Sequence, residues 1–140
     1  MESLPIISKF MDKVVPTLSP DTKILDAVEF LLQHKVTGAP VVDGKGRLLG
    51  IITETDLLSL VTKGVQSQPP TDATVSDYMT HDVVTVGPDT DIYYVAGVFL
   101  SHHFRRLPVV DNGKIVGAIT RYDLLRVVHR LAAGPLVLSA

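Results

Sequence analysis

The chain has 140 residues, of which 46% are hydrophobic and 20% are charged, a balance typical of a folded globular protein. It contains no cysteine, so disulfides, cysteine-ligated zinc and thiol nucleophiles are excluded. The net charge of −2 is shared evenly between the two halves, which disfavours binding of nucleic acid or an anionic membrane through bulk charge. The apolar runs fall far short of the ~20 residues of a membrane span, and the first residues do not have the pattern of a secretory signal. We therefore expect a soluble, cytoplasmic protein with neither a membrane nor a nucleic acid as partner.

The sequence contains one internal repeat. Residues 11–43 align without gaps on residues 79–111, and residues 50–58 align on residues 117–125 once one residue is removed from the preceding turn. Of the 42 aligned pairs 19 are identical, whereas average composition would give about 6% by chance. The chain is therefore expected to contain a first repeat at 8–62, a polar linker with two prolines at 63–74, a second repeat at 75–131 and a C-terminal tail at 132–140.

Both repeats predict the same elements in chain order. A short β-branched run is followed by a Pro-Asp-Thr turn and by a segment with apolar residues at helical spacing. Two strands joined by a turn come next, with Asp43-Gly44 or Asn112-Gly113 as the turn signal, and a second helix ends the repeat. The predicted strands and second helices are 14–18, 39–43, 48–52 and 54–61 in the first repeat, and 83–86, 107–111, 114–119 and 121–131 in the second.

This order predicts an α/β (α+β) fold made of two β-α-β-β-α units. One such unit would leave an apolar face of its sheet uncovered. We therefore expect the two repeats to pack on each other around a pseudo-twofold axis.

The best-preserved segment is Gly-Ile-Ile-Thr-Glu-Thr-Asp at 50–56, repeated as Gly-Ala-Ile-Thr-Arg-Tyr-Asp at 117–123. Each copy leads from a predicted strand into a helix. Threonine with aspartate three residues later is typical of a capping box. The same turn also directs free N–H groups outward, which suits a phosphate, and a carboxylate can accept two hydrogen bonds from a ribose diol. The residues by themselves support both interpretations equally.

Two β-α-β-β-α copies, each with Pro-Val-Val-Asp before a turn and Gly-h-h-Thr-x-x-Asp after it (h, apolar), resemble a tandem pair of cystathionine-β-synthase (CBS) domains, a Bateman module. The resemblance covers residues 8–131. In this family, adenosine-containing ligands such as AMP, ADP, ATP, S-adenosylmethionine and sometimes NAD bind in two clefts between the repeats. The resemblance implies that Asp56 and Asp123 contact the ribose and that Thr53 and Thr120 contact the ribose or phosphate. It places the adenine pocket at Thr17, Gly38, Ala39, Pro40, Thr85, Leu107 and Pro108.

The repeats differ where a phosphate would be held. Arg105-Arg106 in the second repeat stands where the first has Thr37-Gly38, and Arg121 stands where the first has Glu54. Arginine suits bidentate phosphate contacts. We therefore expect phosphate contacts from Arg105, Arg106 and Arg121, and two unequal clefts.

These features predict a non-catalytic regulatory module with no catalytic residue, no metal site and no obligatory cofactor. Its expected ligand is an adenine nucleotide or S-adenosylmethionine, and its expected partners are a second copy in a homodimer and a separate regulated protein. The alternative is a structural module for dimerisation and partner binding whose clefts stay empty. The histidines lack metal-ligand spacing, and we expect the repeat-equivalent His34 and His102 to cap helices.

Overall fold

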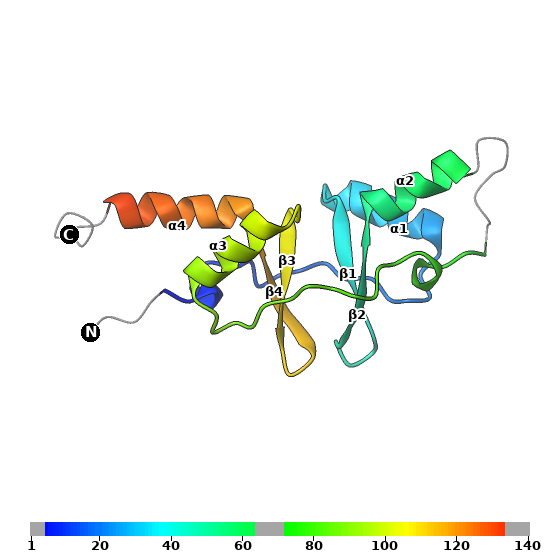
Figure 1. Ribbon diagram of the computed structural model, residues 1–140. Coiled ribbons are helices and arrows are strands. Elements are labelled where there is room, and N and C mark those ends of the chain that lie inside the picture. The colour runs from blue at the N-terminus through cyan, green and yellow to red at the C-terminus, as the bar shows by residue number, and fades with distance from the viewer. Residues whose placement is uncertain (1–4, 64–71, 134–140) are drawn as a thin grey trace. The chain divides into compact units, whose positions relative to one another are not determined.

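The computed structural model describes residues 5–63 and 72–133, which form helices and two β-hairpins (Figure 1). The predicted α+β class is confirmed: each hairpin is a two-stranded sheet, β1 with β2 and β3 with β4. Residues 64–71 of the predicted linker and 134–140 of the predicted tail lie outside the described residues. The elements are η1 (Ile7–Lys9), α1 (Ile24–His34), β1 (Gly38–Val42), β2 (Leu48–Thr53), α2 (Glu54–Lys63), η2 (Val75–Asp77), α3 (Ile92–Ser101), β3 (Arg106–Asp111), β4 (Lys114–Thr120) and α4 (Arg121–Ala133).

The chain divides into two compact units that do not follow the repeat boundaries. The α1–α2 unit holds the described residues within 15–83 together with 113–115. The α3–α4 unit holds the described residues within 1–14, 84–112 and 116–140. Each unit therefore contains the body of one repeat and the N-terminal segment of the other repeat.

The N-terminal segments of the two repeats are thus exchanged between the units. We call residues 5–12 the first lead segment and residues 73–80 the second lead segment. The first belongs to the α3–α4 unit and the second to the α1–α2 unit. Their backbone contacts are equivalent: Ile7 donates its N–H to the carbonyl of Thr90 (2.9 Å), as Val75 does to Thr22 (2.8 Å). Ile7 and Val75 are also the residues by which each lead segment enters its unit's apolar core, and both side chains are fully buried.

Each lead segment also pairs with the strand that carries the repeated motif. Asp12 and Ala118 exchange two backbone hydrogen bonds of 2.9 Å, and Thr80 and Ile51 exchange two of the same length. Ala118 lies in β4 and Ile51 in β2. Because an unpaired backbone group in a buried strand is unfavourable, the lead segments complete the hydrogen bonding of both motif strands.

The first glycine of each motif allows this close approach. A β-carbon built at Gly50 would lie 2.7 Å from the carbonyl oxygen of Thr80, and one built at Gly117 would lie 2.8 Å from that of Asp12. A methionine sulfur of the same lead segment would be as close, at 2.9 and 2.6 Å. Glycine is therefore required at both positions by the backbone that crosses it.

Helical spacing of apolar residues explains the helices that cover the hairpins. In α1 the residues Ile24, Ala27 and Leu31 are buried, and in α3 the side chain of Asp91 accepts a hydrogen bond from the N–H of Tyr94 (2.9 Å) at the N-cap. The buried residues of each unit form one core with the hairpin strands. Among the described residues no helix is both long and apolar enough to cross a membrane.

Two predictions about local structure need correction. The expected strands at 14–18 and 83–86 are reduced to isolated parallel bridges at Leu18 and Val86, because each run contains the point where the chain passes from one unit to the other. The second hairpin turns at Asn112 and Gly113, both with positive φ, as predicted. In the first hairpin the residue with positive φ is Gly46 instead of Gly44, so that turn is longer than expected.

Replacement of either motif glycine should destabilise the fold. We expect Gly50→Ala and Gly117→Ala each to lower the free energy of unfolding by about 1–3 kcal/mol, because the added methyl group must displace a backbone carbonyl. Gly97→Ala is the matched control: Gly97 lies in α3 with open space around it, so this change should raise stability by about 0.5–1 kcal/mol. Urea unfolding measures all three, and a motif variant as stable as the control would contradict the packing described.

Candidate functional site

The motif of the first repeat lies where β2 ends and α2 begins. Thr53 is the last residue of β2, and it pairs with Gly38 at the start of β1. Glu54, the first residue of α2, donates its N–H to the carbonyl of Thr37 (2.8 Å). Leu18 donates its N–H to the carbonyl of Pro40 (3.0 Å), so the chain that follows Thr17 also joins β1. The predicted adenine and ribose residues of this repeat are thus in one unit.

Asp56 is half-buried in the first turn of α2. Its Oδ2 accepts hydrogen bonds from the backbone N–H (2.9 Å) and the hydroxyl (3.2 Å) of Thr53. Among the residues that the structure describes, its Oδ1 accepts only a long hydrogen bond of 3.4 Å, from the hydroxyl of Thr80 in the second lead segment. Oδ1 is therefore the less engaged oxygen of this carboxylate.

Asp123 takes the equivalent place in the first turn of α4 but is more deeply buried, with 8% of the residue exposed. Its Oδ2 accepts the N–H of Thr120 (2.8 Å), and Thr120 Oγ1 accepts the N–H of Asp123 (3.1 Å). Oδ1 accepts a bond of 2.7 Å from the guanidinium of Arg126. The capping interpretation of the motif is thus confirmed: both carboxylates bond the N-cap N–H, where they also favour the helix dipole.

Arg106 is the first residue of β3, and Arg105 immediately precedes it. The guanidinium of Arg106 lies 3.8 Å from the carboxylate of Asp12 in the first lead segment, and its Nε is buried without a hydrogen-bond partner. Arg105 is exposed. Of the two arginines, Arg105 is therefore the more exposed, since the side chain of Arg106 is 26% exposed.

Arg121 is directed at the end of α3. Its Nε donates to the carbonyl of Phe104 (3.0 Å), and a terminal nitrogen donates to the carbonyls of Phe99 and His102. The guanidinium also lies over the ring of Phe99, 5.4 Å from its centroid. These contacts satisfy carbonyls that the helix end leaves unpaired, and the phosphate contact expected of Arg121 stays a prediction.

The residues expected to form the adenine pocket are mostly buried side chains. This applies to Ala39, Pro40, Leu107 and Pro108, whereas Thr17 and Gly38 are half-buried and Thr85 is exposed. Val86, next to Thr85, donates its N–H to the carbonyl of Pro108 (3.2 Å). The equivalent residues of the second repeat are thus gathered in the α3–α4 unit, where the buried members contribute to the core.

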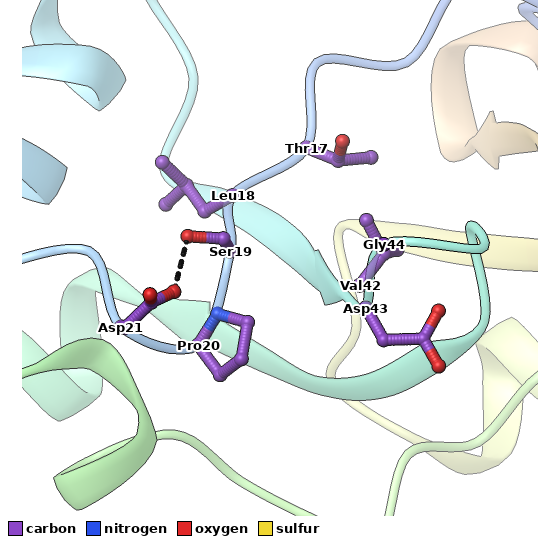
Figure 2. Close-up of a pocket in the computed structure, with 8 residues that line it drawn as sticks. All are labelled: Thr17, Leu18, Ser19, Pro20, Asp21, Val42, Asp43 and Gly44. Atoms are coloured by element: carbon purple, nitrogen blue, oxygen red, sulfur yellow. Dashed lines mark hydrogen bonds between the residues drawn. The ribbon is translucent and has the colours of Figure 1, made fainter.

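A separate open hollow of about 620 Å³ lies beside the β1–β2 turn in the α1–α2 unit (Figure 2). Hydrogen bonds from the backbone N–H groups of Arg47 and Lys45 lower the pKa of the Asp43 carboxyl, and one from the hydroxyl of Ser19 lowers that of Asp21. The hollow shares only Thr17 with the predicted site. Its lining residues are Thr17, Leu18, Ser19, Pro20, Asp21, Val42, Asp43 and Gly44.

The predicted histidine caps are confirmed. His34 Nδ1 lies 2.9 Å from the carbonyl oxygen of Phe30 near the end of α1. His102 Nδ1 lies 3.0 Å from that of Val98 near the end of α3. Both rings are thus engaged with the last turn of a helix.

Sequence reasoning missed three residues that touch the motif carboxylates or their neighbours. Thr80 and Asp12 are repeat-equivalent, so their position in the lead segments could have been found from the alignment. Arg126 directly follows the aligned block, and its place one turn after Asp123 was the available signal. Thr80 contacts Asp56, Asp12 contacts Arg106, and Arg126 contacts Asp123.

Comparison with known families assigns both repeats to the same domain type. The sequence model of the CBS domain matches twice, at residues 7–63 and at residues 75–130. The chain belongs to the CBS domain family. It is thus a tandem CBS pair, as its repeats predicted.

Curated relatives share this CBS pair as part of longer chains. The CBS domain-containing protein CBSX2, chloroplastic, of Arabidopsis thaliana is 34% identical over 134 residues, which cover 78% of this chain and 56% of that protein. The protein MJ1225 of Methanocaldococcus jannaschii is 32% identical over 120 residues, 86% of this chain and 41% of that protein. The chain therefore spans about half the length of these relatives.

Solved structures of CBS pairs match over nearly the whole chain. The crystal structure of CBSX2 in complex with AMP has a TM-score of 0.79 at 33% identity, covering 90% of this chain and 97% of that one. The CBS pair of the protein MJ0100, in complex with 5′-methylthioadenosine and S-adenosylmethionine, has a TM-score of 0.77 at 26% identity, covering 91% and 98%.

The contacts of Arg121 lead to a test of its role in this CBS pair. Arg121→Gln should lower the free energy of unfolding by about 1 kcal/mol, because carbonyls at the end of α3 lose a charged donor. Arg130→Gln removes the same charge from the same helix. Because the guanidinium of Arg130 lies 6.0 Å from the centre of the Phe10 ring, a weak contact, this change should lower stability less. Chemical unfolding compares the two variants; equal stabilities would show that the Arg121 contacts contribute nothing.

Proposed function

We propose that this CBS pair is a non-catalytic regulatory module that binds an adenosine-containing ligand. The observation that carries the proposal is the half-buried carboxylate of Asp56, held one turn inside α2 with Oδ1 almost unengaged. Its surroundings suit a ribose, since a diol supplies the two O–H donors that a carboxylate can accept. The structural relatives that bind AMP, 5′-methylthioadenosine or S-adenosylmethionine support adenosine as the common part of the ligand.

The remaining contacts are assigned by the same chemistry. Thr53 and Thr120, at the ends of β2 and β4, offer hydroxyl groups for the ribose or phosphate. Exposed Arg105 suits a phosphate as a charged bidentate donor. The adenine is assigned to the start of β1, where Thr17 and Gly38 are half-buried, and to the equivalent start of β3, where Thr85 is exposed. The candidate ligands are therefore AMP, ADP, ATP, NAD and S-adenosylmethionine.

A thermal-shift panel of these five compounds tests the proposal. At least one should raise the melting temperature, because a ligand that binds only the folded chain stabilises it. Asp56→Asn should weaken that ligand about tenfold or more through loss of a charge-assisted hydrogen bond. Asp26→Asn, on the exposed surface of α1, is the charge-matched control and should bind as the wild type does. If none of the five shifts the melting temperature, the alternative of a structural module with empty sites is favoured.

Homodimer formation is the second part of the proposal, and exposed apolar residues at equivalent positions of both repeats support it. Leu32 in α1 is 73% exposed and its counterpart Leu100 in α3 is 83% exposed. Leu58 in α2 and its counterpart Leu125 in α4 are also exposed. Apolar surface of this kind usually marks an interface, and a second copy would cover the patches of both units by the same contact.

Light scattering should accordingly give twice the 15.2 kDa mass of one chain at micromolar concentration. The double variant Leu32→Glu with Leu100→Glu should give the mass of one chain, because it places a charge in the exposed apolar surface of each unit. Val14→Glu is the control, since Val14 is 80% exposed but lies outside every helix. A wild-type mass of one chain would contradict the dimer.

A further inference from the structure

We propose that Arg126 determines which of the two motif carboxylates binds the ribose: its ion pair makes the carboxylate of Asp123 unavailable, so that Asp56 binds first. This inference rests on the proposed adenosine binding and assigns its order. Arg126 is thus a specificity-determining residue that acts through the carboxylate it holds.

The contacts of Asp123 leave little room for a diol. Oδ2 is bonded to the N–H of Thr120, and Oδ1 to Arg126 at 2.7 Å, the shorter of the two ion pairs in the described part of the chain. The side chain of Asp123 is only 11% exposed. The side chain of Arg126 is 58% exposed, so solvent screens the pair in part, but the short bond to a buried carboxylate is charge-assisted. At so buried a carboxylate, a ribose diol would have to compete with the guanidinium for Oδ1.

Arg126 is held in this position from a second side. The same terminal nitrogen lies 3.3 Å from the carbonyl oxygen of Phe10, in the first lead segment. The guanidinium also lies over the ring of Tyr122, at 6.0 Å from its centroid. Because the lead segment shares the donor with Asp123, displacement of Arg126 would break both contacts.

Asp56 has no equivalent restraint. Neither ion pair of the described residues involves Asp56. The position equivalent to Arg126 is Ser59, whose hydroxyl donates to the backbone carbonyl of Asp56 (2.6 Å) and leaves the carboxylate alone. Within residues 5–63 and 72–133, the only hydrogen bond to Oδ1 is the long one from Thr80. A neutral hydroxyl is more easily replaced by a ribose hydroxyl than a guanidinium is.

The surrounding charges differ in the same way between the repeats. Asp12, Arg106, Asp123 and Arg126 form two opposite-charge pairs in the α3–α4 unit. The equivalent positions in the α1–α2 unit are Thr80, Gly38, Asp56 and Ser59, of which only Asp56 is charged. The motif carboxylate is therefore paired with a cation in the second repeat, whereas neither ion pair of the described residues involves its counterpart in the first.

Calorimetric titration with adenosine and with AMP tests this order on the full chain. Wild type should bind one equivalent per chain, and Asp56→Asn should weaken that binding at least about tenfold, whereas Asp123→Asn should leave it unchanged. Arg126→Gln should raise the stoichiometry to two per chain, and the double variant Asp56→Asn with Arg126→Gln should keep one. Removal of a cation would ordinarily weaken binding of anionic AMP, so a gain for both probes identifies release of Asp123.

Arg130→Gln is the matched control, because it removes a positive charge one turn further along α4 without touching a carboxylate; it should bind like wild type. If binding is lost in Asp123→Asn instead of Asp56→Asn, or if Arg126→Gln binds fewer or equal equivalents, the inference is wrong while adenosine binding stands. The comparison of Asp56→Asn with Asp123→Asn decides the order even if Arg126→Gln does not fold. If neither probe nor any compound of the thermal-shift panel binds any variant, both proposals fail together.

Discussion

The structure depends on the pairing of each lead segment with the motif strand of the other repeat's body. Two backbone hydrogen bonds join Asp12 to Ala118, and two join Thr80 to Ile51. The crossing is possible because glycine precedes the paired residue in each strand. The motif threonine lies two residues after the strand residue that pairs with the lead segment, and the motif aspartate lies five residues after it. The lead segment therefore also fixes the end of the strand, from which the helix starts. In the α1–α2 unit it reaches the motif carboxylate itself through Thr80.

The repeats retain this backbone arrangement but differ in the side chains around it. Hydrogen bonds at the strands, the buried core positions and the caps recur at equivalent residues. By contrast, the groups within reach of the two carboxylates have changed in charge: Arg126 is replaced by Ser59, and Arg106 by Gly38. Side chains at a partly exposed helix start can vary without loss of the core, so the two motifs can acquire different binding properties on one scaffold.

Much of the fold follows from local sequence patterns. Helical spacing placed α1 and α3, turn residues placed both hairpins, and the repeat located the two motifs, because each of these features is set by residues close together in the chain. The capping role of Thr120 and Asp123 could likewise be predicted from their spacing. What these elements share is that their partners lie within a few residues or in the adjacent strand.

The exchange of the lead segments could not be predicted from local sequence patterns. Met11 packs on Gly117, more than a hundred residues later, and nothing in the local pattern of either residue specifies the other. The acceptors of Arg121 are backbone carbonyls at the end of α3, which any sequence would provide. These contacts could not be predicted, because a backbone acceptor leaves no trace in the sequence.

The exchange has a consequence for any chain that is cut between its repeats. A break within residues 64–71 would give one fragment with the first lead segment and the body of the α1–α2 unit, and another with the second lead segment and the body of the α3–α4 unit. Each fragment then lacks the buried residue, Val75 or Ile7, that completes its own core. We therefore expect each fragment to need the other in order to complete its core.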